Sequence, residues 1–466
     1  MNKRIIIGGM GVAVSNKDLA QEGAKSPDVL STVSGVASWF VVSRILQLGD
    51  VGGHFRRALA HFPFAGVADR IVSKYYVDGG IAQGEQFKPV PAFHLNPSPD
   101  LVELTVASTF AIVWLAKEDH SALISINLLE KMQCMLLAQL YGAMLAGVHV
   151  VTMGAGIPMM VPGVLDAYAK GEPAVYRVVV EGSSLGYIEV HFDPRRYFGD
   201  KLPRLTRPLF LPIVSSHVLA MAMDARLGDG IYGFVVEKKC AGGHNASPRG
   251  QLVLNPRGEP VYGVRDVPNL QKIRDLGRPF WIGGSLASPA GLREAQDLGA
   301  TGIQVGSMFA LSDNSGILSQ YRNEIRRLGF RGELEVLSDP NASPTGFPFQ
   351  VVQLPGTLSD AKVYEDRPRV CDLCALSVAY QRPDGEIGFR CRAQPVSDYG
   401  RLGGRAEDTI GARCLCNGLT ATVGLGSPGE SAIVTLGKDH AYLRQLMTHE
   451  RGSYTASDAI GYLLSG

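Results

Sequence analysis

Short apolar runs recur along the first part of the chain, and polar, helix-forming segments separate several of them. Most of these runs are apolar throughout, which is typical of parallel strands buried on both faces. Eight runs are predicted to be strands: Ile5–Ile7, Leu30–Val33, Leu123–Ile126, His149–Val151, Phe210–Val214, Ile231–Val236, Phe280–Ile282 and Gly302–Val305.

The segments between these runs show helical signals. Ser288, Pro289 and Gly299 fit an N-cap, a first helical position and a terminating residue. Four helices are predicted between the strands: Lys131–Ala146, Ser216–Leu227, Val267–Leu276 and Pro289–Leu298. Eight alternating units predict an α/β fold, a (β/α)8 TIM barrel with insertions, over residues 1–335. Functional groups of such a barrel lie at the carboxyl ends of its strands.

Other segments do not belong to the repeating pattern. Residues 50–110 are predicted to form a helical insertion, and residues 175–192 to form a β-hairpin. The Pro/Gly-rich segment 339–348 is either a linker or a loop folded back over the barrel mouth. Residues 336–466 form a C-terminal extension that is rich in cysteine and weakly periodic.

Composition narrows the class of protein. The chain is 45% hydrophobic and 19% charged, with a net charge of +1, so it can bury a large core. No charged block recruits nucleic acid or an anionic membrane. The apolar stretch 101–116 contains Glu103 and is short for a membrane span. The N-terminus lacks the features of a signal peptide, so we expect a cytoplasmic protein with reduced cysteines.

A histidine follows the sixth predicted strand. The run 231–236 is followed by Glu237 and then by Ala241-Gly242-Gly243-His244-Asn245. An imidazole titrates near neutral pH, so His244 is the candidate general acid or base. Glu237 is either a structural charge at the strand end or a group that orients a neighbour. Cys240 is a small buried thiol or, as the alternative, a nucleophile paired with His244.

Glycines follow the last two predicted strands. Gly283 and Gly284 come after the seventh strand, and Gly306 with Ser307 comes after the eighth. Backbone N–H groups of glycines approach an anion without obstruction by a Cβ atom. Loops after strands seven and eight are the usual phosphate site of barrel enzymes, so together the two pairs predict a bound phosphate, although each alone reads as an ordinary turn.

Glycine, amide and small hydroxyl groups also follow other predicted strands. This set suits a large, planar, phosphorylated ligand, and FMN is the predicted cofactor. The additional residues predicted to bind it are Gly9, Met10, Gly11, Asn127, Met153, Gly154, Ser215, Ala241, Gly242 and Gly243.

The C-terminal extension contains five cysteines with the spacing of thiolate metal ligands. The spacing permits zinc or an iron–sulfur cluster, and the alternative is a set of reduced structural thiols. The candidate ligands are Cys371, Cys374, Cys391, Cys414 and Cys416.

Several of these motifs together resemble the nitronate monooxygenase family, formerly the 2-nitropropane dioxygenases. The resemblance covers about residues 4–330 and rests on Ile7-Gly8-Gly9-Met10-Gly11-Val12, Ile126-Asn127-Leu128, Met153-Gly154, Ala241–Asn245, Gly283-Gly284 and Val305–Phe309.

The resemblance implies an FMN-dependent (β/α)8 barrel with His244 as the catalytic base. It also implies FMN contacts by Met10, Asn127, Gly243, Gly283, Gly284, Gly306 and Ser307. The insertion at 50–110, the segment 343–348 and the cysteine-rich extension are more similar to a subgroup that includes trans-acting enoyl reductases of polyketide and polyunsaturated fatty acid synthases. Ser307 stands where the family commonly has threonine.

These observations predict an FMN-dependent oxidoreductase and leave its substrate open. The first hypothesis is oxidation of a nitronate or nitroalkane by O₂, a small-molecule reaction. The second is NAD(P)H-dependent reduction of an enoyl thioester, in trans with a synthase partner. A non-redox phosphate-binding barrel and a non-catalytic assembly subunit are the alternatives from other classes.

Overall fold

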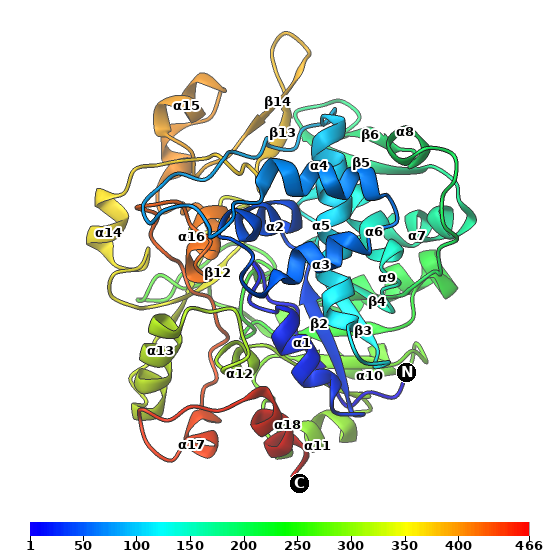
Figure 1. Ribbon diagram of the computed structural model, residues 1–466. Coiled ribbons are helices and arrows are strands. Elements are labelled where there is room, and N and C mark those ends of the chain that lie inside the picture. The colour runs from blue at the N-terminus through cyan, green and yellow to red at the C-terminus, as the bar shows by residue number, and fades with distance from the viewer. Residues whose placement is uncertain (466) are drawn as a thin grey trace.

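The computed structural model describes residues 1–465, and its centre is a closed barrel of eight parallel strands (Figure 1). The strands follow one another around the barrel in the order β1-β10-β9-β8-β7-β4-β3-β2. The predicted (β/α)8 fold is confirmed, and each predicted strand overlaps one strand of the barrel. Their bounds are β1 (Ile5–Ile7), β2 (Val29–Ser34), β3 (Ile124–Leu129), β4 (Val150–Gly154), β7 (Leu209–Val214), β8 (Phe234–Glu237), β9 (Phe280–Gly283) and β10 (Gly302–Val305).

One strand begins later than its apolar run predicts. β8 starts at Phe234, whereas the run starts at Ile231. A Cβ atom on Gly233 would lie 2.1 Å from the carbonyl oxygen of Pro279, so this glycine is where the chain enters the barrel in close contact with the next unit.

The barrel interior is apolar in the middle and polar near the mouth. Buried side chains of Ile6, Leu30, Val150, Leu211, Val235 and Trp281 fill the middle. Strand side chains alternate between two faces, so the residue two positions later also points inward. That position is Thr32 on β2, Thr152 on β4 and Glu237 on β8. These side chains therefore form the floor beneath the carboxyl ends of the strands.

Helices surround the barrel. Ser216 and Ser288 cap α9 and α11 through hydrogen bonds to Leu219 N and Gly291 N, as the sequence predicts for Ser288. Apart from the helices of the insertion between β2 and β3, the helices of the first part of the chain are α1 (Lys17–Ala24), α2 (Ser38–Gln47), α6 (Leu136–Leu145), α7 (Val161–Lys170), α8 (Arg195–Phe198), α9 (His217–Leu227), α10 (Leu270–Arg274), α11 (Pro289–Asp297), α12 (Ser307–Ala310) and α13 (Ser319–Arg331).

The end of the chain completes this outer layer. Helix α18 (Ala456–Leu464) begins with a capping box between Thr455 and Asp458. It packs against α1 and α11, the helices of the first and seventh units, as the lower part of Figure 1 shows. The ring of helices is thus closed by a segment more than a hundred residues beyond the last barrel strand.

The insertion between β2 and β3 is helical, as predicted. It contains α3 (His54–Ala60), α4 (Ala65–Tyr75) and α5 (Pro99–Lys117). Within residues 1–465, α5 is the one helix long and apolar enough to cross a membrane. It packs against α2, α3 and α6, and most of its side chains are buried, so its apolarity is explained by the core.

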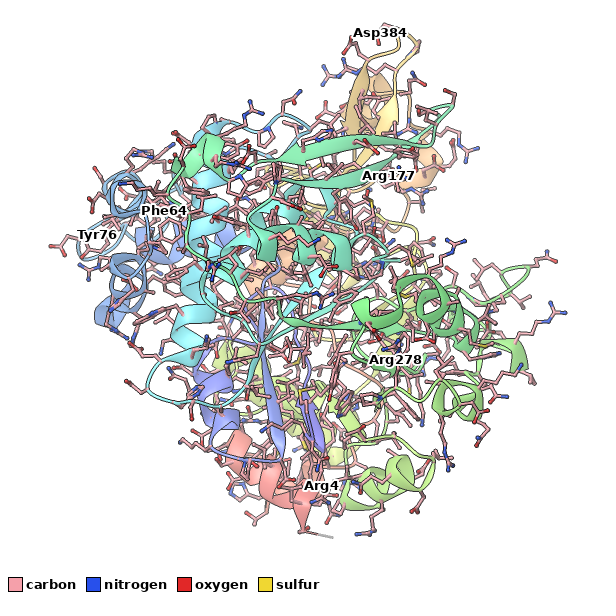
Figure 2. The ribbon with its side chains drawn as sticks, turned by 90° about the vertical axis from the view of Figure 1, so that its right-hand side faces the viewer. Arg4, Phe64, Tyr76, Arg177, Arg278 and Asp384 are labelled. Carbon is pink, nitrogen blue, oxygen red and sulfur yellow. The ribbon has the colours of Figure 1, made fainter. Side chains whose placement is uncertain are left out.

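The predicted hairpin is present and is joined to the C-terminal extension. Strands β5 (Ala174–Glu181) and β6 (Tyr187–Phe192) pair antiparallel, and β13 (Val378–Gln381) adds to β5 in parallel register. The four-stranded sheet is completed by β14 (Ile387–Arg390). Figure 2 shows this sheet at the end of the molecule away from Arg4, with Asp384 at the tip of the β13–β14 turn.

The Pro/Gly-rich segment is a folded loop, so the linker alternative is wrong. Strand β11 (Val336–Asp339) pairs antiparallel with β12 (Phe349–Val352), which turns the intervening residues back on the barrel. The rest of the extension carries α14 (Ala361–Asp366), α15 (Val396–Arg401), α16 (Leu415–Thr422) and α17 (Leu443–Leu446). Leu415, Ile433 and Leu436 of the extension are buried in the same hydrophobic core as the barrel strands.

Candidate active site

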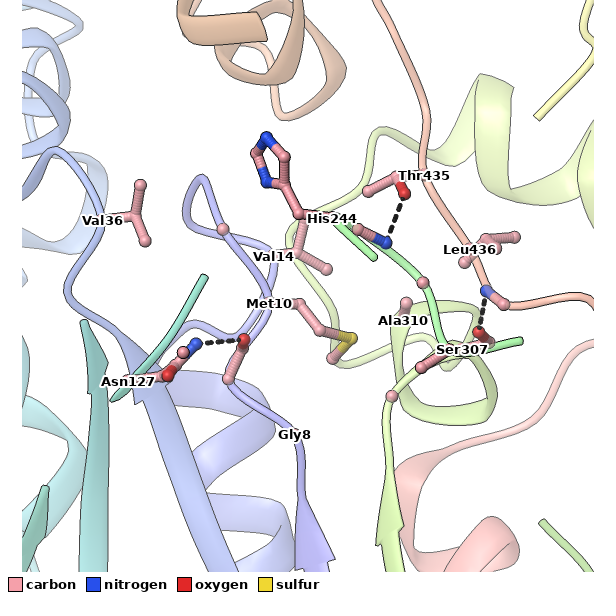
Figure 3. Close-up of a pocket in the computed structure, with 18 of the residues that line it drawn as sticks. Gly8, Met10, Val14, Val36, Asn127, His244, Ser307, Ala310, Thr435 and Leu436 are labelled. Carbon is pink, nitrogen blue, oxygen red and sulfur yellow. Dashed lines mark hydrogen bonds between the residues drawn. The ribbon is translucent and has the colours of Figure 1, made fainter. Parts of the chain in front are cut away.

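A cavity opens at the carboxyl ends of the barrel strands, and residues of the C-terminal extension close over it (Figure 3). Most residues that the sequence selected from separate strand ends lie around this one cavity. The predicted site residues that line it are Gly9, Met10, Gly11, Asn127, Gly154, Ala241, Gly242, Gly243, His244, Gly283, Gly284, Gly306 and Ser307.

Two predicted site residues do not line the cavity. Met153 lies on β4 with its side chain fully buried in the hydrophobic core. Ser215 follows β7 and lines a smaller, neighbouring cavity together with Lys238 and Arg249. Both residues lie at the carboxyl ends of strands, as predicted. Because side chains alternate along a strand, the side chain of Met153 points away from the mouth of the barrel.

The loop after β1 is held directly against Asn127. The amide Nδ2 of Asn127 donates to the carbonyl oxygen of Gly9 at 2.8 Å, and its Oδ1 accepts from Thr152 Oγ1 at 3.2 Å. A Cβ atom on Gly9 would lie 2.1 Å from Cβ of Asn127. Only glycine allows this approach, so Gly9 and Asn127 together set the shape of the cavity floor.

The turns after β9 and β10 present unpaired backbone N–H groups to the cavity. The N–H groups of Gly284, Ser285 and Gly306 have no acceptor within residues 1–465. A Cβ atom on Gly283 would have no neighbour closer than 3.7 Å, and Gly284 has a φ of 103°. Unpaired N–H donors on residues that line a cavity are what a phosphate group requires.

The residues around the cavity fit FMN. The glycine turns after β9 and β10 supply donors for the phosphate. Gly243 (φ 82°) has open space on its Cβ side, and Met10 lies beside Gly306 across the mouth. The cavity therefore offers backbone N–H groups that can bind a phosphate, open space beside Gly243, and apolar walls, as a planar phosphorylated cofactor requires.

His244 lies at the cavity wall and is held by Ser343 of the loop after β11 and by Phe349 of β12. Its Nε2 atom is hydrogen-bonded to Oγ of Ser343 at 2.7 Å. Its ring meets the ring of Phe349 edge-on, with centroids 4.9 Å apart. Burial, with a smaller contribution from the Lys131 ammonium, lowers the pKa of His244 to about 3. The imidazole is therefore neutral at physiological pH.

The loop that carries His244 is clamped on one side by the segment around β12. The N–H of Asn245 donates to the carbonyl oxygen of Pro348 at 2.8 Å, and that of Gln350 donates to Gly243 O at 2.9 Å. The Gln350 side chain donates to Asn245 Oδ1 at 2.7 Å. These bonds fix the backbone on both sides of the histidine.

A second segment of the extension clamps the other side of this loop. The N–H of Gly243 donates to Thr435 Oγ1 at 2.8 Å, and the N–H of Lys438 donates to Cys240 O at 3.0 Å. Gly437 N donates to Ser307 Oγ at 2.7 Å, which links the same segment to the loop after β10 (Figure 3). The His244 loop and the Ser307 turn are thus held in place by one segment of the extension, residues 435–438.

The extension also supplies an apolar wall that the sequence did not reveal. Its contribution includes the side chains of Leu373, Leu376, Leu415, Leu419, Val434 and Leu436. One indication of this wall was present in the sequence: one of the two predictions for segment 339–348 was a loop folded back over the barrel mouth. Nothing in the local pattern showed which later leucines would follow it.

Glu237 and Cys240 also line the cavity, and the sequence left both roles open. Burial raises the pKa of Glu237 to about 8. Glu237 makes no ion pair or side-chain hydrogen bond in the part of the chain that the structure describes. Cys240 lies against Gly284, whose Cβ position would be 3.1 Å from its sulfur, and no hydrogen bond joins it to His244 in residues 1–465.

The five cysteines of the extension come near one another without forming a metal site. Sγ of Cys371 lies 3.4 Å from Sγ of Cys374, and Cys391 is buried with Cys371 and Cys414. All five, Cys416 included, are free thiols. No group of three or more histidine, cysteine or carboxylate side chains within the described residues is placed to hold a metal ion. The predicted zinc or iron–sulfur site is therefore unsupported.

Comparison with known proteins identifies similar shapes but no sequence family. No protein-family model matches the chain, and no curated protein matches it. FabK from Thermotoga maritima is similar in structure, with 15% identity and a TM-score of 0.49 over 100% of this chain and 92% of that chain.

Two further solved structures are similar at a comparable level. The enoyl reductase domain of MlnA, from the macrolactin biosynthesis cluster of Bacillus amyloliquefaciens, has 9% identity and a TM-score of 0.47 over 100% of this chain and 94% of that chain. Nitroalkane oxidase from Streptomyces ansochromogenes has 11% identity and a TM-score of 0.44 over 99% and 95%.

Proposed function

We propose that this protein is an FMN-dependent oxidoreductase of the nitronate monooxygenase type. The observation that carries the proposal is a neutral imidazole, His244, in the same cavity as the unpaired N–H groups after β9 and β10. FMN, when bound, supplies the redox chemistry, which belongs to the cofactor. The net reaction converts two nitronate ions and one O₂ to two carbonyl compounds and two nitrite ions.

The residues of the chain handle the substrate proton and the cofactor phosphate. His244 removes the α-proton when a neutral nitroalkane binds, because its imidazole is uncharged and its position is fixed by Ser343. Gly284, Ser285 and Gly306 offer their N–H groups to the phosphate. The apolar wall from the extension keeps water from the reacting carbon.

The visible spectrum of the purified protein is the first test. We expect flavin absorbance, retained through gel filtration, and nitronate-dependent oxygen uptake. His244→Asn should keep the flavin but lose oxidation of neutral nitroalkanes, because only that reaction needs the base. A colourless protein that does not bind added FMN would contradict the proposal and favour a non-redox barrel.

The apolar wall favours a second candidate, reduction of an enoyl thioester. Leu376, Leu415 and Leu419 line the cavity on the side of the extension, where an acyl chain can be buried. In this reaction hydride goes to Cβ and a proton goes to Cα, and a partner synthase would supply the thioester. NAD(P)H oxidation that depends on an added enoyl thioester, without nitronate-dependent oxygen uptake, would favour this candidate over the first.

A further inference from the structure

Glu237 occupies a central position that neither proposed reaction explains. It is the last residue of β8, and it stands directly opposite Gly283 in the ladder with β9. Val235 points into the barrel, so Glu237 two residues later points inward as well, at the level of the cavity floor. The carboxyl group therefore lies beside the glycine turn that offers N–H groups to a phosphate.

No charged neighbour balances this carboxyl group. The titratable or charged residues that line the two cavities beside it are Lys238, Lys239, Arg249, Tyr262 and Asp266 on one side, and Cys240, His244, Cys416, Asp439 and Tyr442 on the side of the main cavity. Three cations lie on the outer side; Lys239 Nζ lies 5.2 Å from the centre of the Tyr262 ring, and no side-chain hydrogen bond joins Lys238, Lys239 or Arg249 to Glu237 in residues 1–465. None of these residues forms an ion pair with Glu237 in residues 1–465.

Burial without a counter-charge favours the protonated carboxyl, and it raises the pKa of Glu237 to about 8. A protonated carboxyl donates one O–H, whereas a carboxylate only accepts hydrogen bonds. An anionic, phosphorylated cofactor is compatible with the first form and is repelled by the second.

We propose that Glu237 acts as a neutral hydrogen-bond donor on the cavity floor and that FMN binds only while this residue holds its proton. The inference rests on the proposed FMN site and assigns Glu237 the role of controlling cofactor occupancy with pH. No electron or group is transferred, because the proton only leaves Glu237 for solvent as the pH rises.

Equilibrium binding of FMN to the flavin-free protein, followed by flavin fluorescence, tests the proposal. Above the pKa of about 8, the dissociation constant of the wild type should rise by about tenfold per pH unit. Glu237→Gln keeps a donor that does not ionise, so its affinity should stay constant over this range. His191→Asn, at an exposed position on β6, is the control, and it should retain the pH dependence of the wild type.

Parallel titrations with riboflavin locate the contact. If riboflavin loses affinity as FMN does, Glu237 contacts the ring or its side chain, and if riboflavin does not, Glu237 acts beside the phosphate. Two results would overturn the inference while leaving the FMN site intact. One is a wild-type affinity for FMN that does not change with pH, and the other is a Glu237→Gln variant whose affinity for FMN still falls as the pH rises. Absence of flavin binding at every pH would instead overturn the proposed function.

Infrared difference spectroscopy provides a readout without the cofactor. The flavin-free wild type should show the carbonyl stretch of a buried protonated carboxyl at neutral pH, and this band should disappear above the pKa of Glu237. The band should be absent from Glu237→Gln. If the wild-type protein shows only carboxylate bands at neutral pH, the inference is wrong, whether or not the variant folds well.

Discussion

The backbone N–H of Gly243 donates to the hydroxyl oxygen of Thr435 at 2.8 Å, across 192 residues of sequence. This bond holds the loop next to His244 against the C-terminal extension. The extension is therefore part of the candidate active site, since it fixes the position of the residue that is proposed to move the proton.

Substitution at Thr435 tests this role. Thr435→Val preserves the size of the side chain but leaves the Gly243 N–H without its acceptor, at a cost of about 1–3 kcal/mol. We expect kcat to fall by about tenfold or more with smaller changes in stability, measured by steady-state kinetics and thermal unfolding. Thr435→Ser keeps the hydroxyl and should stay close to wild type. Equal losses in the two variants would contradict the assignment.

Ser343 should matter because it orients the imidazole. Its Oγ lies 2.7 Å from Nε2 of His244, so Ser343→Ala frees the ring to rotate. We expect His244→Asn to reduce turnover of neutral nitroalkanes by about 10²–10⁴-fold and Ser343→Ala by about tenfold. Preformed nitronates need no deprotonation and should be affected less by both substitutions. An unchanged rate with nitroalkanes in His244→Asn would rule out the base role.

The buried histidine also predicts how stability depends on pH. The pKa of His244 is about 3 in the folded protein and near 6.5 when exposed. Between pH 6.5 and pH 3 the imidazole of the unfolded chain binds a proton that the folded protein does not bind. The free energy of unfolding is therefore highest above pH 6.5 and decreases as the pH falls toward 3. The melting temperature of the wild type should therefore fall more steeply on acidification than that of His244→Asn.

The control for this measurement is His191→Asn, because His191 is exposed on β6. Its substitution should leave the acid dependence of the melting temperature as it is in the wild type. If His244→Asn and the wild type lose stability in parallel from neutral to acidic pH, His244 is not held neutral by its surroundings.

Gly9 should not tolerate a side chain. A Cβ atom there would overlap Cβ of Asn127, so Gly9→Ala must displace the loop after β1 or the β3 end. We expect loss of more than about 2 kcal/mol of unfolding free energy together with weaker FMN binding, measured by denaturant unfolding and fluorescence. The matched control is Gly163→Ala in α7, where a Cβ meets nothing within 4 Å. It should stabilise the protein by up to about 1 kcal/mol.

The alternation of apolar runs and helical segments determined the barrel. Strands buried on both faces must be apolar throughout, and parallel strands require connecting helices, so the local pattern along residues 1–335 was sufficient. The strand-end positions of Asn127, His244 and Gly283 followed from the same pattern, because all carboxyl ends of a parallel barrel meet at one mouth. Met153 was misplaced because a strand-end position does not define which way a side chain points.

Tertiary structure alone decided what surrounds His244. Ser343, Thr435 and the leucines of the extension reach the site through contacts across 99 residues or more, and such contacts leave no periodic signal in the sequence. The protonation states of His244 and Glu237 were likewise decided by burial, which depends on the whole fold rather than on neighbours along the chain. The sequence by itself determined the barrel and which residues meet at its mouth, while only the folded extension determined the apolar wall, the clamped loop and the charge of the two titratable groups.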